Sequence, residues 1–186
     1  MGKLSFLWQY ASKPRTVGAV LPSSKYLAGK MIKDINFNDE HCIVEYGAGT
    51  GVFTEKIINM RRPSTTVIVF EMNTTFATEL TKRFGHEPNV HIYNESAVNI
   101  NKRLAACGQK NASCIVSGLP FASLPQDVTV NILEQTRACL HPSGQFITFQ
   151  YSLLKKDLIQ KYFANIKVTR ELRNMPPAYV LSCKPL

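Results

Sequence analysis

The feature that most constrains the fold is a regular alternation of short β-branched runs with longer amphipathic stretches. Apolar runs of strand length recur along the chain, and helix-like segments separate the first five of them. We expect strands at 41–46, 65–71, 89–93, 113–117 and 144–151, and helices at 52–60, 74–84, 98–106, 126–140 and 155–163. Strands that alternate with helices form a parallel sheet covered on both faces. The pattern therefore predicts a doubly wound α/β fold, whose ligand lies at the carboxyl ends of the strands.

Two further strands are expected near the end of the chain. They span 166–173 and 178–184, and only the turn residues 174–177 separate them. So short a connection predicts an antiparallel hairpin, which completes a seven-stranded sheet.

The start of the chain predicts a helical extension. Apolar residues at spacings of three and four indicate a short amphipathic helix, which ends before Pro14. A second helix should begin after Pro22, with Ser23 or Ser24 as its N-cap. The apolar positions of the first helix are Leu4, Leu7, Trp8 and Ala11.

Composition and charge restrict the setting of the protein. Its length of 186 residues suits a single domain, and no apolar run approaches the roughly 18 residues of a membrane span. The start lacks the apolar core of a signal peptide, so we expect a cytoplasmic protein. The net charge of +9 favours an anionic partner. Residues 1–33 carry six basic residues and no acidic one, which predicts that the front of the protein meets this partner.

A glycine-rich segment follows the first expected strand and precedes a helix. It reads Glu45-Tyr46-Gly47-Ala48-Gly49-Thr50-Gly51, and glycines in such a turn let the backbone approach a ligand closely. A dinucleotide fingerprint would require its third glycine where this chain has Val52, so a pyrophosphate ligand fits poorly. The acid at position 45 suits a ligand that carries a positive amino group.

This segment resembles motif I of the class I S-adenosylmethionine-dependent methyltransferases, which have a Rossmann-like fold. The resemblance implies S-adenosylmethionine as cofactor. Glu71 closes the second strand about 20 residues after the loop and suits the ribose hydroxyls. The segment from Asn94 to Ala97 resembles the one that contacts adenine in this family. The implied cofactor-binding residues are Glu45, Tyr46, Gly47, Ala48, Gly49, Gly51, Glu71, Met72, Glu95, Ser96 and Ser117.

The acceptor is expected beside the turn Ser117-Gly118-Leu119-Pro120-Phe121, which ends the fourth strand. Backbone carbonyls of this turn, such as that of Leu119, could hold amine protons, and Ser117 could add a hydroxyl acceptor. Phe121 could offer its π-face to a cation. The alternative is a plain turn with Phe121 in the core.

The turn resembles the Asn-Leu-Pro-Tyr turn of the rRNA adenine dimethylases, with Ser117 and Gly118 in the asparagine region. A resemblance over nearly the whole chain is to the soluble bacterial phospholipid N-methyltransferases. It rests on the segments 14–24, 45–51, 117–120 and 174–178. It implies methylation of phosphatidylethanolamine towards phosphatidylcholine. The alternative functions are rRNA adenine N6-methylation and, less favoured because the acceptor turn is intact, a regulator that binds the cofactor without catalysis.

A lipid acceptor also gives the front of the chain a role. Within a single domain of residues 1–186, we expect 1–38 to form a helical lid or membrane-contact segment and 39–186 the cofactor-binding core. The first helix could lie at the bilayer interface as part of a peripheral membrane protein, or pack as a lid. Arg15 is our candidate for the lipid phosphate, although it could bind RNA phosphate instead. Tyr26 and Tyr151 could wall the amine.

Cysteine and histidine spacing indicates no metal site. The five cysteines form no CxxC pair, and the four histidines form no cluster of ligands. We therefore expect reduced cysteines, most of them in the core, and no bound metal. No feature of the sequence points to a protein partner.

Overall fold

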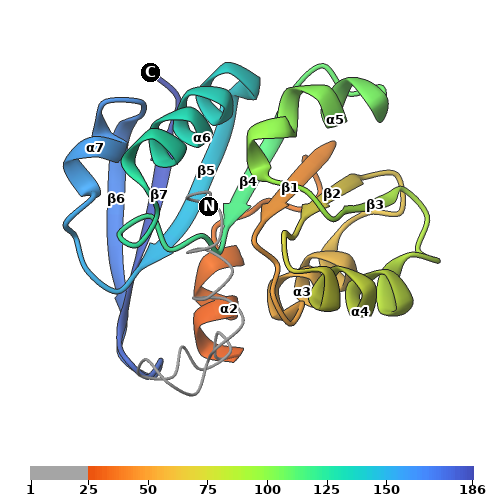
Figure 1. Ribbon diagram of the computed structural model, residues 1–186, viewed down its shortest axis with the longest axis horizontal. Helices are drawn as coiled ribbons and strands as arrows, with labels where there is room; N and C mark the ends of the chain where they lie inside the picture. Colours follow the sequence, from red (N-terminus) through yellow and green to blue (C-terminus); the bar gives the residue numbers. More distant parts are fainter. Residues whose placement is uncertain (1–24) are drawn as a thin grey trace, which may run out of the picture.

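The structure is a computed structural model that describes residues 25–186. The predicted first helix, Arg15 and the predicted cap at Ser23 or Ser24 therefore lie outside the described residues. One seven-stranded sheet runs through the molecule in the order β3-β2-β1-β4-β5-β7-β6 (Figure 1). The strands are β1 Cys42–Tyr46, β2 Thr66–Phe70, β3 Val90–Tyr93, β4 Ala112–Ser117, β5 Leu140–Gln150, β6 Ala164–Glu171 and β7 Ala178–Lys184.

Strand direction follows the prediction. Strands β1 to β5 pair in parallel, whereas β7 is antiparallel to both β5 and β6. The order reverses between β1 and β4, because the chain returns to the middle of the sheet after building β2 and β3. The carboxyl ends of β1 and β4 therefore meet where an open α/β sheet holds its ligand.

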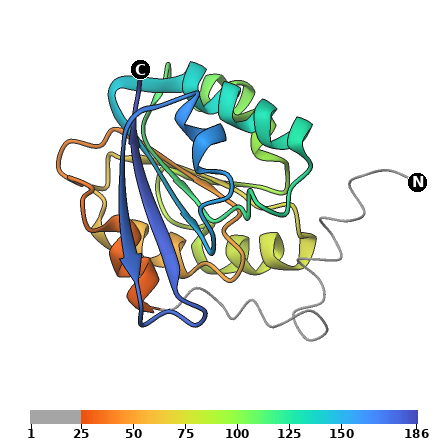
Figure 2. The same ribbon diagram turned by 90° about the vertical axis from the view of Figure 1, so that its left-hand side faces the viewer.

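Helices cover both faces of the sheet, so the fold has three layers (Figures 1 and 2). The face bearing Ile43, Val67 and Val116 packs against α2, α3 and α4. The opposite face, bearing Val44, Ile68 and Ile115, packs against α5, α6 and α7. The helices are α2 Lys25–Ile32, α3 Val52–Met60, α4 Thr74–Phe84, α5 Ile100–Ala106, α6 Gln126–Cys139 and α7 Lys156–Gln160.

Alternation along each strand produces these two cores. Side chains of successive strand residues point to opposite faces, and the central strands carry apolar residues on both faces because helices bury both. All five residues of β1 and of β2 are buried. The buried acid Glu45 is thus held inside an otherwise apolar strand, next to Val69 and Val116 in the sheet register.

Several boundaries differ from the prediction. Strand β5 starts at Leu140 rather than at 144, because Leu140 already pairs with Ala112 before a register shift leads to the pair Cys114 and Gln145. The predicted helix at 98–106 is a 3-10 turn, Ala97–Asn99, followed by α5. The predicted helix at 155–163 shortens to α7, and the predicted strand at 166–173 lies two residues earlier, as β6.

The cysteines match the expectation of reduced residues. All five are free, and only Cys107 is not buried. Burial raises the pKa of Cys42, Cys139 and Cys183 to about 12. These thiols are therefore protonated and poorly nucleophilic at neutral pH. Within residues 25–186, no helix combines the length and the apolar character needed to cross a bilayer.

Candidate active site

The candidate site forms where the turns after β1 and β4 touch. The backbone N–H of Gly118 donates to the carbonyl oxygen of Tyr46 at 2.8 Å, and that of Gly47 donates to Phe70 at 2.7 Å. A Cβ at position 118 would lie only 2.7 Å from the carbonyl oxygen of Gly47. The two turns can approach this closely only because residue 118 has no side chain.

The glycine loop keeps one part of its backbone open. Gly47, Gly49 and Gly51 all have positive φ angles, of 65°, 54° and 81°. A Cβ at position 51 would lie 2.7 Å from Leu80, so Gly51 is required by packing. A Cβ at position 49 would meet nothing within 4 Å. Gly49 therefore borders space into which a ligand could fit.

Glu45 is a fully buried acid with one unused oxygen. Its Oε2 accepts a hydrogen bond from the Thr54 hydroxyl at 2.7 Å, whereas its Oε1 has no hydrogen-bond partner among residues 25–186. Burial raises the pKa of Glu45 to about 8, and the charge of Glu71 adds to the rise while the Thr54 bond opposes it. A buried unpaired acceptor is unfavourable unless a ligand completes it. Glu45 Oε1 could accept a hydrogen bond from an ammonium group.

Glu71 joins the end of β2 to the glycine loop. Its Oε2 accepts the Gly49 N–H at 2.7 Å, and its Oε1 accepts the Asn73 N–H at 2.8 Å. An ionised carboxylate has about four acceptor positions, so these two bonds leave capacity for the hydroxyls of a ribose. Met72 follows and is 38% exposed, which gives a planar ring an apolar surface to lie on.

The segment after β3 uses its polar side chains locally. Glu95 forms an ion pair with Arg103 and also accepts from Asn99 at 3.0 Å. Ser96 caps the 3-10 turn, where its Oγ accepts the Val98 N–H at 3.4 Å. The contacts of Glu95 and Ser96 with adenine remain predictions.

The acceptor turn after β4 is held from within. The Ser117 hydroxyl is buried and accepts the Leu119 N–H at 3.2 Å. The Leu119 side chain lies over Gly47, within 2.8 Å of where a Cβ would be. Phe121 is fully buried, with its ring 6.3 Å from that of Phe146. The π-face of Phe121 could reach a cation only if this packing changed. The position of Phe121 therefore matches the alternative prediction of a plain turn with this residue in the core.

Tyr46 and Ala48, which the motif also contains, offer little side-chain surface. The Tyr46 hydroxyl is paired with Thr136 at 3.1 Å inside the core, and its ring packs edge-on against Phe70. Ala48 is buried and accepts the Gly51 N–H at 2.9 Å. Their role in cofactor binding, which would be through the backbone, remains a prediction.

Four residues that the sequence reasoning did not single out shape this site. Thr54 orients Glu45 from the first turn of α3. Arg83 donates to the Thr50 carbonyl oxygen at 2.8 Å and so braces the glycine loop from α4. Asn94, although inside a quoted segment, was not a candidate; its Nδ2 donates to the carbonyls of Glu71 and Met72 and ties β3 to β2.

The fourth residue, Gln150, ends β5 beside the acceptor turn. Its Nε2 donates to the Leu119 carbonyl oxygen at 3.1 Å and to the Thr148 hydroxyl at 3.2 Å. The position at the carboxyl end of a strand could have identified Gln150 from sequence, because β5 is expected next to β4. It places a carboxamide next to a turn that lacks an asparagine.

The predicted substrate residues lie near the hairpin of β6 and β7. Tyr26 is exposed at the start of α2, and the guanidinium of Arg173 lies 4.5 Å from the centre of its ring. Tyr151 packs edge-on against Phe149 with ring centres 5.6 Å apart. Burial raises the pKa of Tyr151, and the nearby Asn174 side chain opposes this rise.

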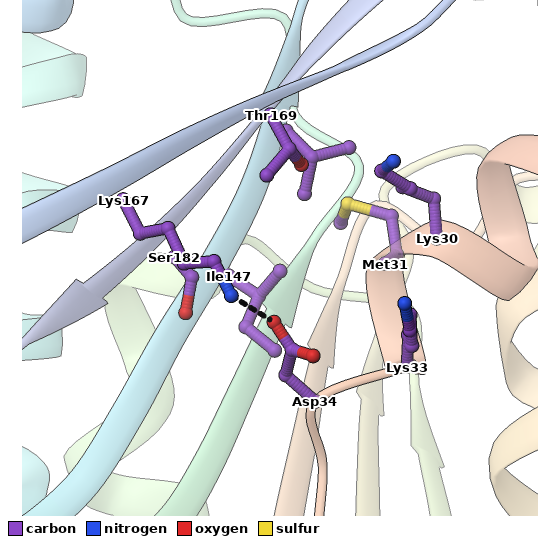
Figure 3. Close-up of a pocket in the computed structure, with 9 residues that line it drawn as sticks. Lys30, Met31, Lys33, Asp34, Ile147, Lys167, Thr169 and Ser182 are labelled. Carbon is purple, nitrogen blue, oxygen red and sulfur yellow. Dashed lines mark hydrogen bonds and ion pairs between the residues drawn. The ribbon is translucent and has the colours of Figure 1, made fainter.

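A small pocket of about 80 Å³ lies between α2 and the face of β5, β7 and β6 (Figure 3). Lys30 and Lys33 line it from the helix end, and Lys167 pairs with Asp34 at 3.0 Å across it. Basic residues at a helix carboxyl end interact favourably with its free carbonyls. None of the predicted site residues lines this pocket. Among residues 25–186, no group of three or more potential ligands could hold a metal ion.

Comparisons of the sequence match the chain to methyltransferases. The model of the family described as ribosomal RNA adenine dimethylase matches residues 21–170. An ornithine lipid N-methyltransferase from Singulisphaera acidiphila is 29% identical over 181 residues, which cover 96% of this chain and 94% of that protein. Ribosomal RNA small subunit methyltransferase A from Thermotoga petrophila is 26% identical over 131 residues, which cover 70% of this chain but 45% of that protein.

Solved structures share the architecture at low sequence identity. The N-methyltransferase NodS from Bradyrhizobium japonicum, in complex with S-adenosyl-L-homocysteine, has a TM-score of 0.74 at 8% identity, over 97% of this chain and 98% of that one. A 1,6-didemethyltoxoflavin N1-methyltransferase from Burkholderia thailandensis has a TM-score of 0.70 at 12% identity, over 98% and 86%. These likenesses confirm the predicted Rossmann-like methyltransferase fold.

Proposed function

The chain belongs to the ribosomal RNA adenine dimethylase family and is an S-adenosylmethionine-dependent methyltransferase, and from this premise we propose that it methylates the amine of a membrane aminolipid. Phosphatidylethanolamine is the proposed acceptor. The relative that aligns over nearly the full length of both chains is named an ornithine lipid N-methyltransferase. Both lipids present an amine at the membrane surface, so this relative supports an aminolipid as the acceptor class.

One observation carries the choice of lipid over adenine. The rRNA enzymes have an asparagine in the turn that this chain builds with Ser117 and Gly118. A Cβ at position 118 would lie 2.7 Å from the carbonyl oxygen of Gly47, so a side chain at this position would require the two turns to move apart. The close approach of the turns therefore disfavours an asparagine at position 118, which supports an acceptor other than adenine. A flexible primary amine needs fewer in-plane contacts than a heteroaromatic ring.

The residues present fit the cofactor. Its ammonium group would pair with the unused Oε1 of Glu45, and its ribose hydroxyls with the carboxylate of Glu71. The open side of Gly49 leaves space for its amino-acid part, and Met72 offers an apolar surface for adenine, with Glu95 and Ser96 at the edge of the ring. When bound, S-adenosylmethionine supplies a methyl group activated by a positively charged sulfur.

The acceptor turn would position the amine and exclude side reactions. The nitrogen must be neutral when it forms the new bond to carbon, so an ammonium proton leaves before transfer. None of the cofactor and acceptor motifs contains a histidine, and water or a nearby oxygen is the default proton acceptor. Gln150 holds the Leu119 carbonyl, which we propose helps to direct the amine lone pair towards the methyl carbon. We therefore treat Gln150 as a positioning residue.

The family match and the Thermotoga relative also support rRNA adenine as a second candidate acceptor. Incubation of the purified full chain with labelled cofactor, in parallel with phosphatidylethanolamine vesicles and with rRNA, separates the two. We expect label in the lipid fraction. Label in RNA alone would overturn the proposal.

Two variants control this experiment. Glu45→Gln removes the proposed partner of the cofactor ammonium and should abolish most transfer. Glu79→Gln changes an exposed acid on α4, which pairs with Lys82 on the same helix, and should leave transfer unchanged. Equal loss in both variants would show that the effect of Glu45→Gln is not specific to the cofactor.

An aminolipid acceptor places the protein at a membrane. We propose that it is cytoplasmic and peripherally associated with an anionic surface, which its net charge of +9 favours. The contact that we predicted for residues 1–15, including the phosphate contact of Arg15, lies outside the described residues. Deletion of residues 1–15 should weaken flotation with acidic vesicles, and the loss should be larger at low salt.

A further inference from the structure

Two buried polar atoms at the carboxyl edge of the sheet have no hydrogen-bond partner among residues 25–186. They are Glu45 Oε1, which the proposed cofactor contact uses, and the hydroxyl oxygen of Tyr151. The other such atoms in this range, Glu40 Oε2 and Arg61 Nε, belong to residues that precede β1 and β2 and so lie at the amino edge. A buried polar atom without a partner is unfavourable unless a ligand completes it. The Tyr151 hydroxyl is therefore a second candidate for a ligand contact.

Tyr151 lies on the same face of the sheet as Glu45. Its ring packs against the core that α2 and α3 cover. Its ring centre is 5.6 Å from that of Phe149, which is in turn 6.0 Å from that of Phe53 on α3. Thr54, the next residue of α3, donates to Glu45. A continuous row of packed side chains thus joins the two unpartnered oxygens.

The two oxygens lie on opposite sides of the acceptor turn. The sheet order places β4, which leads into this turn, between β1 and β5 (Figure 1). The acids proposed to hold the cofactor follow or end β1, β2 and β3, all on one side of β4. Tyr151 follows β5 on the other side, directly after Gln150, whose Nε2 donates to the Leu119 carbonyl oxygen of the turn. Tyr151 is only half-buried as a residue, and its position is that of an acceptor contact rather than of a cofactor contact.

The surroundings of Tyr151 keep its phenol neutral. Burial raises its pKa, and the nearby Asn174 side chain opposes the rise. Asn174 is itself buried, and its Nδ2 donates to the Pro176 carbonyl oxygen at 2.7 Å. A phenol that stays protonated at neutral pH is not a base, but its oxygen can still accept a hydrogen bond. The donor that suits it at this place is the N–H of an amine.

We infer that the Tyr151 hydroxyl oxygen accepts a hydrogen bond from an N–H of the acceptor amine. This inference rests on the proposed aminolipid acceptor and names a residue that orients its nitrogen. The amine loses one proton to water before transfer, its lone pair forms the bond to the methyl carbon, and the electrons of the broken C–S bond stay on sulfur. A remaining N–H that is held by Tyr151 fixes the direction of the lone pair.

The contact depends on how many methyl groups the nitrogen already carries. In its neutral form, phosphatidylethanolamine has two N–H bonds, its monomethyl derivative has one and its dimethyl derivative has none. Tyr151 can therefore orient the nitrogen in a first and a second transfer but not in a third. In a third transfer the hydroxyl would face methyl groups and stay without a partner, which is unfavourable. Tyr151 thus favours the early transfers over the last.

The test gives the full chain each of these three lipids separately, in phosphatidylcholine vesicles that contain one acceptor lipid at a time. Tyr151→Phe removes the hydroxyl and keeps the ring. Tyr179→Phe is the matched control, because it removes a hydroxyl from β7, where the ring packs on the opposite face of the sheet. We expect Tyr151→Phe to lower kcat/KM about tenfold for the two lipids that have an N–H, and not to lower it for the dimethyl lipid. Tyr179→Phe should match the parent with all three.

Two further measurements separate loss of the contact from loss of packing. Tyr151→Phe should bind S-adenosylhomocysteine as the parent does. Its thermal unfolding midpoint should be unchanged or higher, because a buried hydroxyl without a partner is removed. An equal loss of kcat/KM with all three lipids would overturn the inference, since the number of N–H bonds would then have no effect.

The outcome with the parent protein separates this inference from the proposed function. If the parent methylates phosphatidylethanolamine and Tyr151→Phe does so equally well, the inference is wrong and the proposed acceptor stands. If the parent methylates none of the three lipids, the proposed acceptor is wrong and the inference fails with it.

Discussion

Binding of the cofactor product should release a proton, because Glu45 must ionise to pair with an ammonium group. Without ligand, burial raises the pKa of Glu45 to about 8, so the carboxyl is mostly protonated at neutral pH. S-adenosylhomocysteine carries the same amino-acid part as the cofactor. Its ammonium group would lie next to Oε1, the oxygen without a partner, and would stabilise the charged form.

The pKa sets the size of the effect. A group with a pKa of about 8 is roughly 10% ionised at pH 7, so binding should release about 0.9 proton there. The affinity should rise about tenfold between pH 6 and pH 7, since each pH unit below the pKa changes the ionised fraction tenfold. The amine of a free amino acid titrates above this range and does not mask the change.

Isothermal titration calorimetry in buffers of different ionisation enthalpy measures the released proton directly. Methylthioadenosine, which lacks the amino-acid part, is the matched ligand and should bind without proton release. Glu45→Gln is the matched variant. It should bind S-adenosylhomocysteine about 10- to 100-fold more weakly at pH 8, where a charge-assisted bond is lost, and show no pH dependence from this group. An enthalpy independent of the buffer at pH 7, or an equal affinity at pH 6 and pH 7, would refute this account of Glu45.

Three further changes test other parts of the site. Without ligand, Glu45→Gln should raise the free energy of unfolding by a few kcal/mol at pH 8.5 but little at pH 4.5. The pKa of Glu45 in the folded protein exceeds its ordinary value of 4.5, so the unfolded state binds fewer protons between these two pH values. The stability of the wild-type protein therefore falls as the pH rises. Gly118→Ala places a Cβ 2.7 Å from a backbone oxygen and should cost about 1–3 kcal/mol in thermal unfolding, whereas Gly29→Ala, with nothing within 4 Å, should be neutral or slightly stabilising. Gln150→Leu removes the donor to the Leu119 carbonyl and should lower kcat about tenfold with unchanged affinity for S-adenosylhomocysteine; an unchanged kcat would remove Gln150 from the site.

Local sequence patterns predicted most of the fold because particular residues mark where several helices and strands begin and end. Helix α3 follows three glycines, and α4 begins after Asn73, whose side chain accepts from the N–H groups of Thr75 and Phe76. Their predicted bounds agree with the structure. In the structure, strand β5 begins at Leu140, four residues before its predicted start. Leu140 pairs with Ala112 on the far side of a register shift, and such a pairing depends on the neighbouring strand. Local signals do not contain that information.

The sequence predicted those parts of the site that lie directly at the ends of strands. The acid at the end of β2 and the glycine loop are brought together as expected, through the bond from Gly49 to Glu71. The unused oxygen of Glu45 depends on where Thr54 points, and the exclusion of a side chain at Gly118 depends on the approach of Gly47. The first contact joins β1 to α3 across the glycine loop, and the second joins two turns far apart in the chain, so neither follows from a local pattern. The sequence predicted the cofactor chemistry, whereas the close packing at Gly118 became visible only in the structure.

Mass spectrometry of the lipid product tests the central claim most directly. The purified protein is incubated with S-adenosylmethionine and a mixture of phosphatidylethanolamine vesicles and rRNA, and both products are fragmented to locate the added methyl group. The account predicts a methyl group on the headgroup nitrogen of the lipid, absent in the Glu45→Gln variant. A methyl group on N6 of an rRNA adenine, with the lipid unmodified, would contradict it.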